Sequence, residues 1–194
     1  MSAFHSGNAM STDNVRIRET AIHEAGHAVL HLVLTLGLKE VTIVPDYDQQ
    51  AAGASVHGGE WGNPASDLGE EDDDTATLRM LAEEAFWLRH AIACYAGAEA
   101  VKQLCPDEPN PEAGADSDFH DAKQAIWRVT EDPESMDLLF ALAKRRCTLL
   151  VEHYRAEISA LAIALLAQSR LSGQEARKVI FDSLKGRRGR LRMF

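Results

Sequence analysis

Apolar residues recur at helical spacing in the segment from Val15 to Leu36. The apolar positions are Ile17, Ala21, Ala25, Ala28, Val29 and Leu32. Because residues three and four apart lie on the same face of a helix, this spacing predicts an amphipathic helix. Gly37 follows as a stop signal.

Two short segments with strand character come next. Lys39–Pro45 alternates in polarity and is rich in β-branched residues, so it predicts a strand. Gly53–His57 is the expected partner strand, reached through a polar turn at Asp46–Gln50. From Gly58 to about Asp74 the chain is rich in Gly, Asp and Glu, which predicts a loop.

The rest of the chain has helical patterns separated by breakers. Helices are predicted over Thr75–Leu104, Ser117–Thr130, Glu134–Gln168 (with room for one break) and Gly173–Leu184. Three prolines make Cys105–Ala115 a loop. We therefore expect a mainly α fold with a small β-sheet, of the α+β class. One domain over residues 15–184 is expected between a flexible N-terminal segment, 1–14, and a basic C-terminal tail, 185–194.

Composition and charge exclude several kinds of protein. A formal net charge of −10 has the wrong sign for neutralising phosphates, so no nucleic-acid partner is expected. The three cysteines are irregularly spaced and indicate no disulfide framework. Residues 1–14 lack the apolar stretch of a signal peptide, and the longest apolar segment, Ile158–Ala167, is too short to span a membrane. We therefore expect a cytoplasmic protein.

The predicted first helix contains the sequence His23-Glu24-Ala25-Gly26-His27. His23 and His27 are four residues apart, so both imidazoles can face one metal ion. Glu24 is placed to take a proton from a water molecule that such an ion activates. Gly26 leaves room for another segment to approach the helix closely.

The same pattern also has a simpler interpretation. A chance match to this motif in a chain of this length has a probability of roughly a few per cent, and the helix would then carry two surface histidines without any metal. The small apolar neighbours Ala21, Ala25 and Ala28 favour a metal site, because a solvated face is normally richer in charge. A metal-free helical protein remains the alternative.

The spacing of residues does not identify a third metal ligand. His31 lies one turn further along the same helix, but three ligands from one straight helix cannot surround a tetrahedral ion. The segment 116–121 offers Asp116, Asp118, His120 and Asp121 at the start of a helix. Acidic residues are also favoured at helix starts because they cap free backbone N–H groups. From the residues alone, capping and metal binding both stay open.

Four segments together resemble the peptidase domain of the FtsH-type ATP-dependent zinc metalloproteases. Residues 20–29 (TAIHEAGHAV) resemble its zinc-binding helix, and residues 41–45 (VTIVP) with 52–55 (AGAS) its next two strands. Residues 114–118 (GADSD) resemble its Gly-Ala-x-x-Asp element, and residues 171–175 (LSGQE) its C-terminal Leu-x-Gly-Glu-Glu element. The order and rough spacing agree over about residues 15–184.

The resemblance implies a mainly helical zinc peptidase domain with Zn²⁺ as its cofactor. It implies His23, His27 and Asp118 as zinc ligands and Glu24 as the general base. It also makes the strand from Gly53 to His57 the edge that pairs with an extended substrate. The implied substrate-binding residues are Gly53, Ala54, Ser55, Val56 and His57.

The chain departs from that family in two respects. It has no Gly-x-x-x-x-Gly-Lys-Ser/Thr loop, so a separate ATPase or an oligomeric partner is expected if proteolysis depends on ATP. Residues 97–102 (GAEAVK) also lack the acidic pair of the corresponding family element. The expected function is a zinc-dependent endopeptidase that hydrolyses unfolded or flexible polypeptides through a metal-activated water. The alternative is a catalytically degenerate, zinc-containing module that binds peptides or a partner protein.

Overall fold

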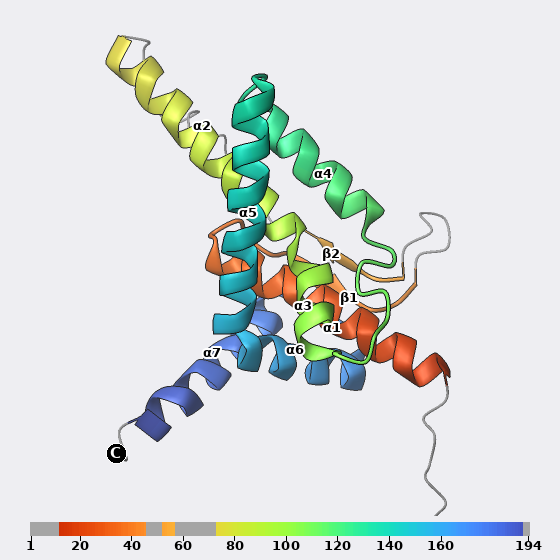
Figure 1. The fold of residues 1–194 in the computed structure, drawn as a ribbon. Helices are drawn as coiled ribbons and strands as arrows, with labels where there is room; N and C mark the ends of the chain where they lie inside the picture. The colour runs from red at the N-terminus through yellow and green to blue at the C-terminus, as the bar shows by residue number, and fades with distance from the viewer. Residues whose placement is uncertain (1–11, 46–51, 57–72, 192–194) are drawn as a thin grey trace, which may run out of the picture.

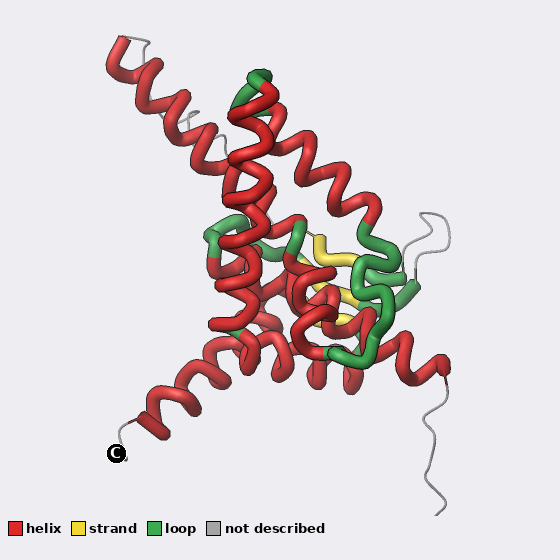
Figure 2. The backbone as a smooth tube through the Cα atoms, in the orientation of Figure 1, coloured by secondary structure: helices red, strands yellow, loops and turns green. Residues whose placement is uncertain are grey.

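The computed structural model describes residues 12–45, 52–56 and 73–191. It contains seven helices and three short strands within this part of the chain (Figures 1 and 2). Their order is α1 (Thr12–Val33), β1 (Glu40–Thr42), β2 (Ala54–Val56), α2 (Asp73–Cys94), α3 (Ala96–Leu104), α4 (Asp116–Trp127), α5 (Pro133–His153), α6 (Arg155–Gln168), β3 (Arg170–Ser172) and α7 (Gly173–Leu191). The fold is mostly helical with a small sheet, which confirms the expected class.

Helix α1 lies at the centre of the hydrophobic core. Its middle is almost completely covered, because Ala25, Ala28, Val29 and Leu30 are fully buried. α3 and α6 pack along it, and the sheet covers a further part of its surface (Figure 1). The helix was predicted over Val15–Leu36 and ends at Val33. The two predicted histidine positions therefore lie on a helix that its neighbours hold in place.

Among the described residues, the sheet has three strands rather than the two that the sequence predicted. β1 pairs antiparallel with β2 on one side and with β3 on the other, so the order is β2-β1-β3. The predicted strands are confirmed: β1 is shorter than expected, and the second strand is described over Ala54–Val56. β3 was not predicted, because three residues between two helices carry too little alternation to stand out. β2 is an edge strand of the described sheet.

Two of the predicted helices are interrupted. The helix expected over Thr75–Leu104 is wrong as a single element, because it divides at Tyr95 into α2 and α3. The division lets α3 turn and pack against α1. The helix expected over Glu134–Gln168 breaks once, at Tyr154. No proline or glycine stands at either break, so contacts between helices decide both positions.

α2, α4 and α5 pack together and extend away from α1 (Figure 1). The first half of α2 projects beyond this group, and its Leu78 and Leu81 are 58% and 52% exposed. The buried residues Ile92 and Tyr95 belong to the part of the chain that returns to the core. The apolar side chains of α2 are therefore buried only toward its C-terminal end.

Both ends of the predicted domain differ slightly from expectation. α1 begins at Thr12, inside the segment predicted as flexible, and α7 continues to Leu191, into the segment predicted as a tail. The predicted loop at Cys105–Ala115 is confirmed, since it separates α3 from α4. No helix among the described residues is long and apolar enough to cross a membrane.

Candidate metal centre

The packing of α1 fixes the backbone that carries the His-Glu-x-x-His sequence. A Cβ added at Gly26 would lie 2.6 Å from the carbonyl oxygen of Ala96 and 2.7 Å from the Cβ of Ala100. The missing side chain therefore lets α3 approach α1 closely, as the sequence predicted. This contact places the first turn of α3 beside His23 and His27.

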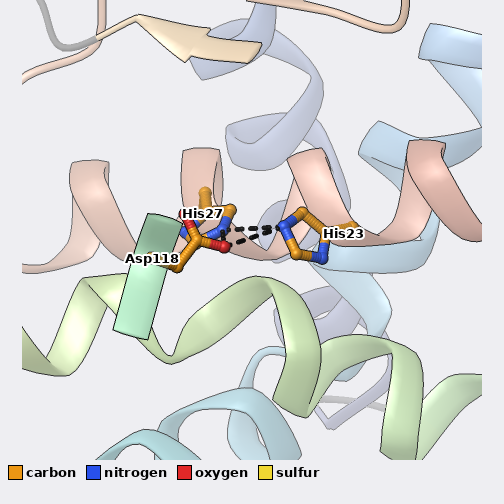
Figure 3. Close-up of side chains that lie close together, drawn as sticks. All are labelled: His23, His27 and Asp118. Carbon is orange, nitrogen blue, oxygen red and sulfur yellow. Dashed lines mark hydrogen bonds and ion pairs between the residues drawn. The ribbon is translucent and has the colours of Figure 1, made fainter. Parts of the chain in front are cut away.

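Three side chains converge at one point beside α1 (Figure 3). The Nε2 atoms of His23 and His27 lie 3.1 Å apart. Asp118 Oδ2, from the first turn of α4, lies 3.1 Å from each of these nitrogens. α1 and α4 are about ninety residues apart in the chain, so only the tertiary structure brings these atoms together.

The arrangement of these three atoms can hold one metal ion. Nitrogen and oxygen ligands bound at about 2.0–2.2 Å in tetrahedral geometry lie roughly 3.3 Å from one another. The observed separations of 3.1 Å are close to that value. Two imidazole nitrogens and a carboxylate oxygen are all electron-pair donors, so a cation or a shared proton must lie between them.

Gly97 has no side chain at the point where α3 faces the two histidines. A Cβ added at this position would lie 2.4 Å from His23 Nε2 and 2.5 Å from His27 Nε2. A methyl group there would collide with both imidazole rings, so the absence of a side chain at Gly97 keeps the two nitrogens uncovered. We conclude that the residues around this point fit a bound metal ion.

A backbone contact orients the ring of His27. Its Nδ1 lies 2.9 Å from the carbonyl oxygen of Ala93. A carbonyl oxygen can only accept, so Nδ1 carries the hydrogen and donates it. In the neutral ring, the lone pair of Nε2 is then directed at the point shared with His23 and Asp118. Histidine ligands in metal sites commonly have such a partner on the second nitrogen.

Charge interactions within the site are strong. Burial lowers the pKa of His27, but the hydrogen bond to Asp118 and the charges of Asp118 and Glu24 outweigh it and raise that pKa to about 9. For Asp118, burial acts in the opposite direction and raises the pKa. The hydrogen bonds from His23 and His27 outweigh it and hold that pKa well below its usual value. The carboxylate therefore stays ionised and favours a positive charge beside it.

Glu24 lies next to this cluster and faces the sheet. Its side chain is buried, with 7% of its surface exposed. Burial raises its pKa, while His27, His23 and a hydrogen bond from Ser55 lower it in part. A carboxylate with a raised pKa binds a proton more readily, which suits a general base.

A cavity of about 930 Å³ contains the cluster. His23, Glu24, His27 and Asp118 lie on its wall, together with Gly53, Ala54 and Ser55 from the β2 region. Of the other predicted substrate-binding residues, Val56 belongs to β2 but does not line the cavity, and His57 lies outside the described residues. The loop between α3 and α4 forms another part of the wall.

The structure separates Asp118 from the other candidates in the segment 116–121. Asp116, His120 and Asp121 are exposed, and the described metal-ligand cluster contains none of them. The residue before α4 is Ala115, which has no side-chain capping bond. The carboxylate of Asp118 contacts the histidines, so capping does not account for it.

Two groups of the site, Gly97 and the Ala93 carbonyl, were not predicted from the sequence. A single glycine inside a stretch with strong helical character was the available signal for Gly97. The Ala93 contact involves only backbone, so its residue type carries no signal.

Comparison with known protein families and with curated proteins found no match. The geometry of the site and the sequence segments around it therefore carry the functional argument.

Proposed function

We propose that the protein is a zinc-dependent endopeptidase of the FtsH type that hydrolyses peptide bonds in unfolded or flexible polypeptides. One observation carries the proposal. Three ligand atoms of His23, His27 and Asp118 converge within 4.8 Å of one another, and Glu24 lies beside them in the same cavity. Three protein ligands with one position left for water are typical of catalytic rather than structural zinc sites.

The mixed set of two imidazoles and one carboxylate suits zinc, which accepts nitrogen and oxygen ligands in tetrahedral geometry. When bound, zinc supplies a Lewis acid that activates water and polarises a carbonyl group. Glu24 then takes the proton of the attacking water. Ser55 donates a hydrogen bond to Oε2 of Glu24 at 3.1 Å, which holds the carboxylate at one end. The same carboxyl group passes the proton to the departing amine.

The substrate is proposed to bind along β2. This strand has a neighbour, β1, on one side only among the described strands, and the chain at Gly53–Ser55 lines the cavity. An extended peptide can add to such an edge through its backbone N–H and C=O groups. Backbone pairing requires an unfolded or flexible segment and depends little on side chains.

The first test measures zinc content and casein cleavage in the same set of variants. Purified without chelators, the protein is expected to contain about one zinc per chain and to cleave casein. Glu24→Gln keeps the shape of the side chain but cannot take the proton, so zinc is retained and cleavage falls at least 100-fold, at the lower end expected for loss of a general base (~10²–10⁴). Zinc content and cleavage are both expected to be lost in His23→Ala, His27→Ala and Asp118→Ala. His120→Ala, on the same helix as Asp118 but exposed, serves as the matched control and retains both.

Other results would refute the proposal in distinguishable ways. A zinc-loaded protein that cleaves neither casein nor a broad peptide library, with Glu24→Gln behaving identically, would rule out the peptidase. Stoichiometric peptide binding without turnover would then favour a binding module. Recovery of cleavage only after a separate ATPase is added would assign the activity to a two-component protease. Absence of zinc, even after reconstitution, would rule out the metal centre itself.

A further inference from the structure

The hydroxyl group of Ser55 joins the edge strand to the proposed base. Ser55 Oγ lies 3.1 Å from Glu24 Oε2 and 3.0 Å from the backbone carbonyl oxygen of Glu24. Both are acceptors when the carboxyl group is ionised, so the single hydroxyl hydrogen is shared between them. The hydroxyl thereby ties the end of the Glu24 side chain to its own backbone.

We propose that Ser55 is a positioning residue that holds the Glu24 carboxylate in the orientation needed for proton transfer. The inference rests on the proposed function, because it assigns Ser55 a part in the same reaction. A glutamate side chain has three rotatable bonds, and α1 fixes only its first atoms. Without a contact at its end, the carboxylate would lose part of its alignment.

The chain on the N-terminal side of Ser55 restricts the same side chain. A Cβ added at Gly53 would lie 2.9 Å from Glu24 Cγ and 3.0 Å from Glu24 Oε1. The backbone at Gly53 therefore lies close to Cγ and Oε1 of Glu24, while Ser55 binds Oε2. β2 and the residue before it thus restrict where the carboxylate lies.

This arrangement links substrate binding to the base. β2 is an edge strand of the described sheet, and it is the strand proposed to pair with the peptide. Its register with β1, in which Ser55 is opposite Val41, sets the position of the hydroxyl. A peptide that straightens and steadies β2 also steadies the hydrogen bond to Glu24. We expect the loss of the hydroxyl to affect the chemical step more than the binding of substrate.

The test compares Ser55→Val with Ser55→Thr. The two side chains have nearly the same shape, but only threonine keeps a hydroxyl. Ser55→Val is expected to lower kcat roughly 10- to 100-fold, the scale of a small misplacement of a catalytic group, with KM within about twofold and full zinc content. Ser55→Thr restores kcat to within about threefold of the wild type. Ser159→Ala removes a hydroxyl that binds a backbone carbonyl on α6, and it is the control for the loss of a serine hydroxyl elsewhere.

If the β-branched pair does not fold, Ser55→Ala replaces Ser55→Val and is compared with the wild type. Equal kcat values for the two members of the pair would overturn the inference. So would a loss confined to KM or to zinc content, because either would make Ser55 a packing or binding residue.

A second measurement does not depend on activity. In the zinc-free protein, Ser55→Val is expected to have a lower urea midpoint than Ser55→Thr. In a Glu24→Ala background this difference should shrink, because the acceptor on the side chain is gone. If the urea midpoints of Ser55→Val and Ser55→Thr differ equally with Glu24 and with Glu24→Ala, the proposed contact between Ser55 and Glu24 is wrong. If the wild type cleaves no peptide, the proposed function fails while this measurement still decides whether Ser55 holds Glu24.

Discussion

Gly97 has no side chain, and the metal-facing nitrogens of His23 and His27 lie where a side chain would point. A methyl group there would be 2.4 and 2.5 Å from the two nitrogens, much closer than non-bonded atoms approach. Gly97 lies in the first turn of α3, a helix that packs tightly against α1. At the scale of single residues, the site therefore depends on the missing side chain of Gly97 as well as on the three candidate ligands.

Gly97→Ala is expected to abolish stoichiometric zinc binding, because the new methyl group would collide with both histidine rings and displace them. Gly186→Ala is the matched control, since a Cβ at Gly186 in α7 meets nothing within 4 Å. It keeps zinc and gains stability by up to about 1 kcal/mol from higher helix propensity. Elemental analysis of both variants after gel filtration checks the prediction. A full equivalent of zinc in Gly97→Ala would contradict it.

The start of α7 shows how local sequence stabilises an element near the site. Glu175 Oε2 accepts hydrogen bonds from the backbone N and the hydroxyl of Ser172, at 2.8 and 2.7 Å. Glu175 N in turn donates to Ser172 Oγ at 3.3 Å. This reciprocal pair is a capping box. It joins α7 to β3, which pairs with β1 in the sheet that also contains β2.

The capping box predicts a pH dependence of stability. The Ser172 side chain, and then its backbone N–H, lower the pKa of Glu175 from its ordinary value of 4.5. A lowered pKa stabilises the folded state fully above pH 4.5, and the effect is lost as the pH falls through the folded-state value. Glu175→Gln is therefore expected to lower the urea midpoint at pH 7, and its difference from the wild type should vanish as the pH falls through the lowered pKa of Glu175.

Glu152→Gln provides the control for that measurement, because Glu152 is an exposed acid on α5. Its urea midpoint should follow the wild type across the same range of pH. A constant difference between Glu175→Gln and the wild type from pH 7 to pH 3 would show that the charge of Glu175 does not act through the cap.

At the scale of the whole molecule, the candidate metal centre connects parts of the fold that are distant in sequence. α1 contributes two of the candidate ligands and α4 contributes the third, 91 residues beyond His27. α4 belongs to the group of helices that extends away from α1 (Figure 1). A bound ion would therefore hold this group against the core helix.

Zinc is expected to raise the unfolding temperature of the wild-type protein. An ion present at 100 times its Kd stabilises the folded state by about 2.7 kcal/mol, which corresponds to a shift of roughly 5–11 °C for a chain of this size. Scanning calorimetry with and without a chelator measures the shift. Asp118→Asn should lose most of it and His120→Ala should keep it. An equal shift in Asp118→Asn and the wild type would place the zinc elsewhere.

The sequence alone determined much of the local structure. The spacing of apolar residues predicted α1, the alternating β-branched segment Lys39–Pro45 predicted β1, and Gly53–His57 was expected as its partner strand. The His-Glu-x-x-His pattern placed two imidazoles on one face, because a helix brings residues four apart together wherever it lies. These features depend on residues within a few positions of one another, and each leaves a short pattern in the chain.

Only the tertiary structure decided how distant segments meet. From spacing alone, Asp118 could not be separated from Asp116, His120 or Asp121, and the resemblance to a known family selected it by register. The packing of α4 against α2 and α5 brings its carboxylate to the histidines. The division at Tyr95, the pairing of β3 and the closeness of Gly97 to the site have the same origin. Each results from the packing of elements far apart in the chain, for which no short sequence pattern exists.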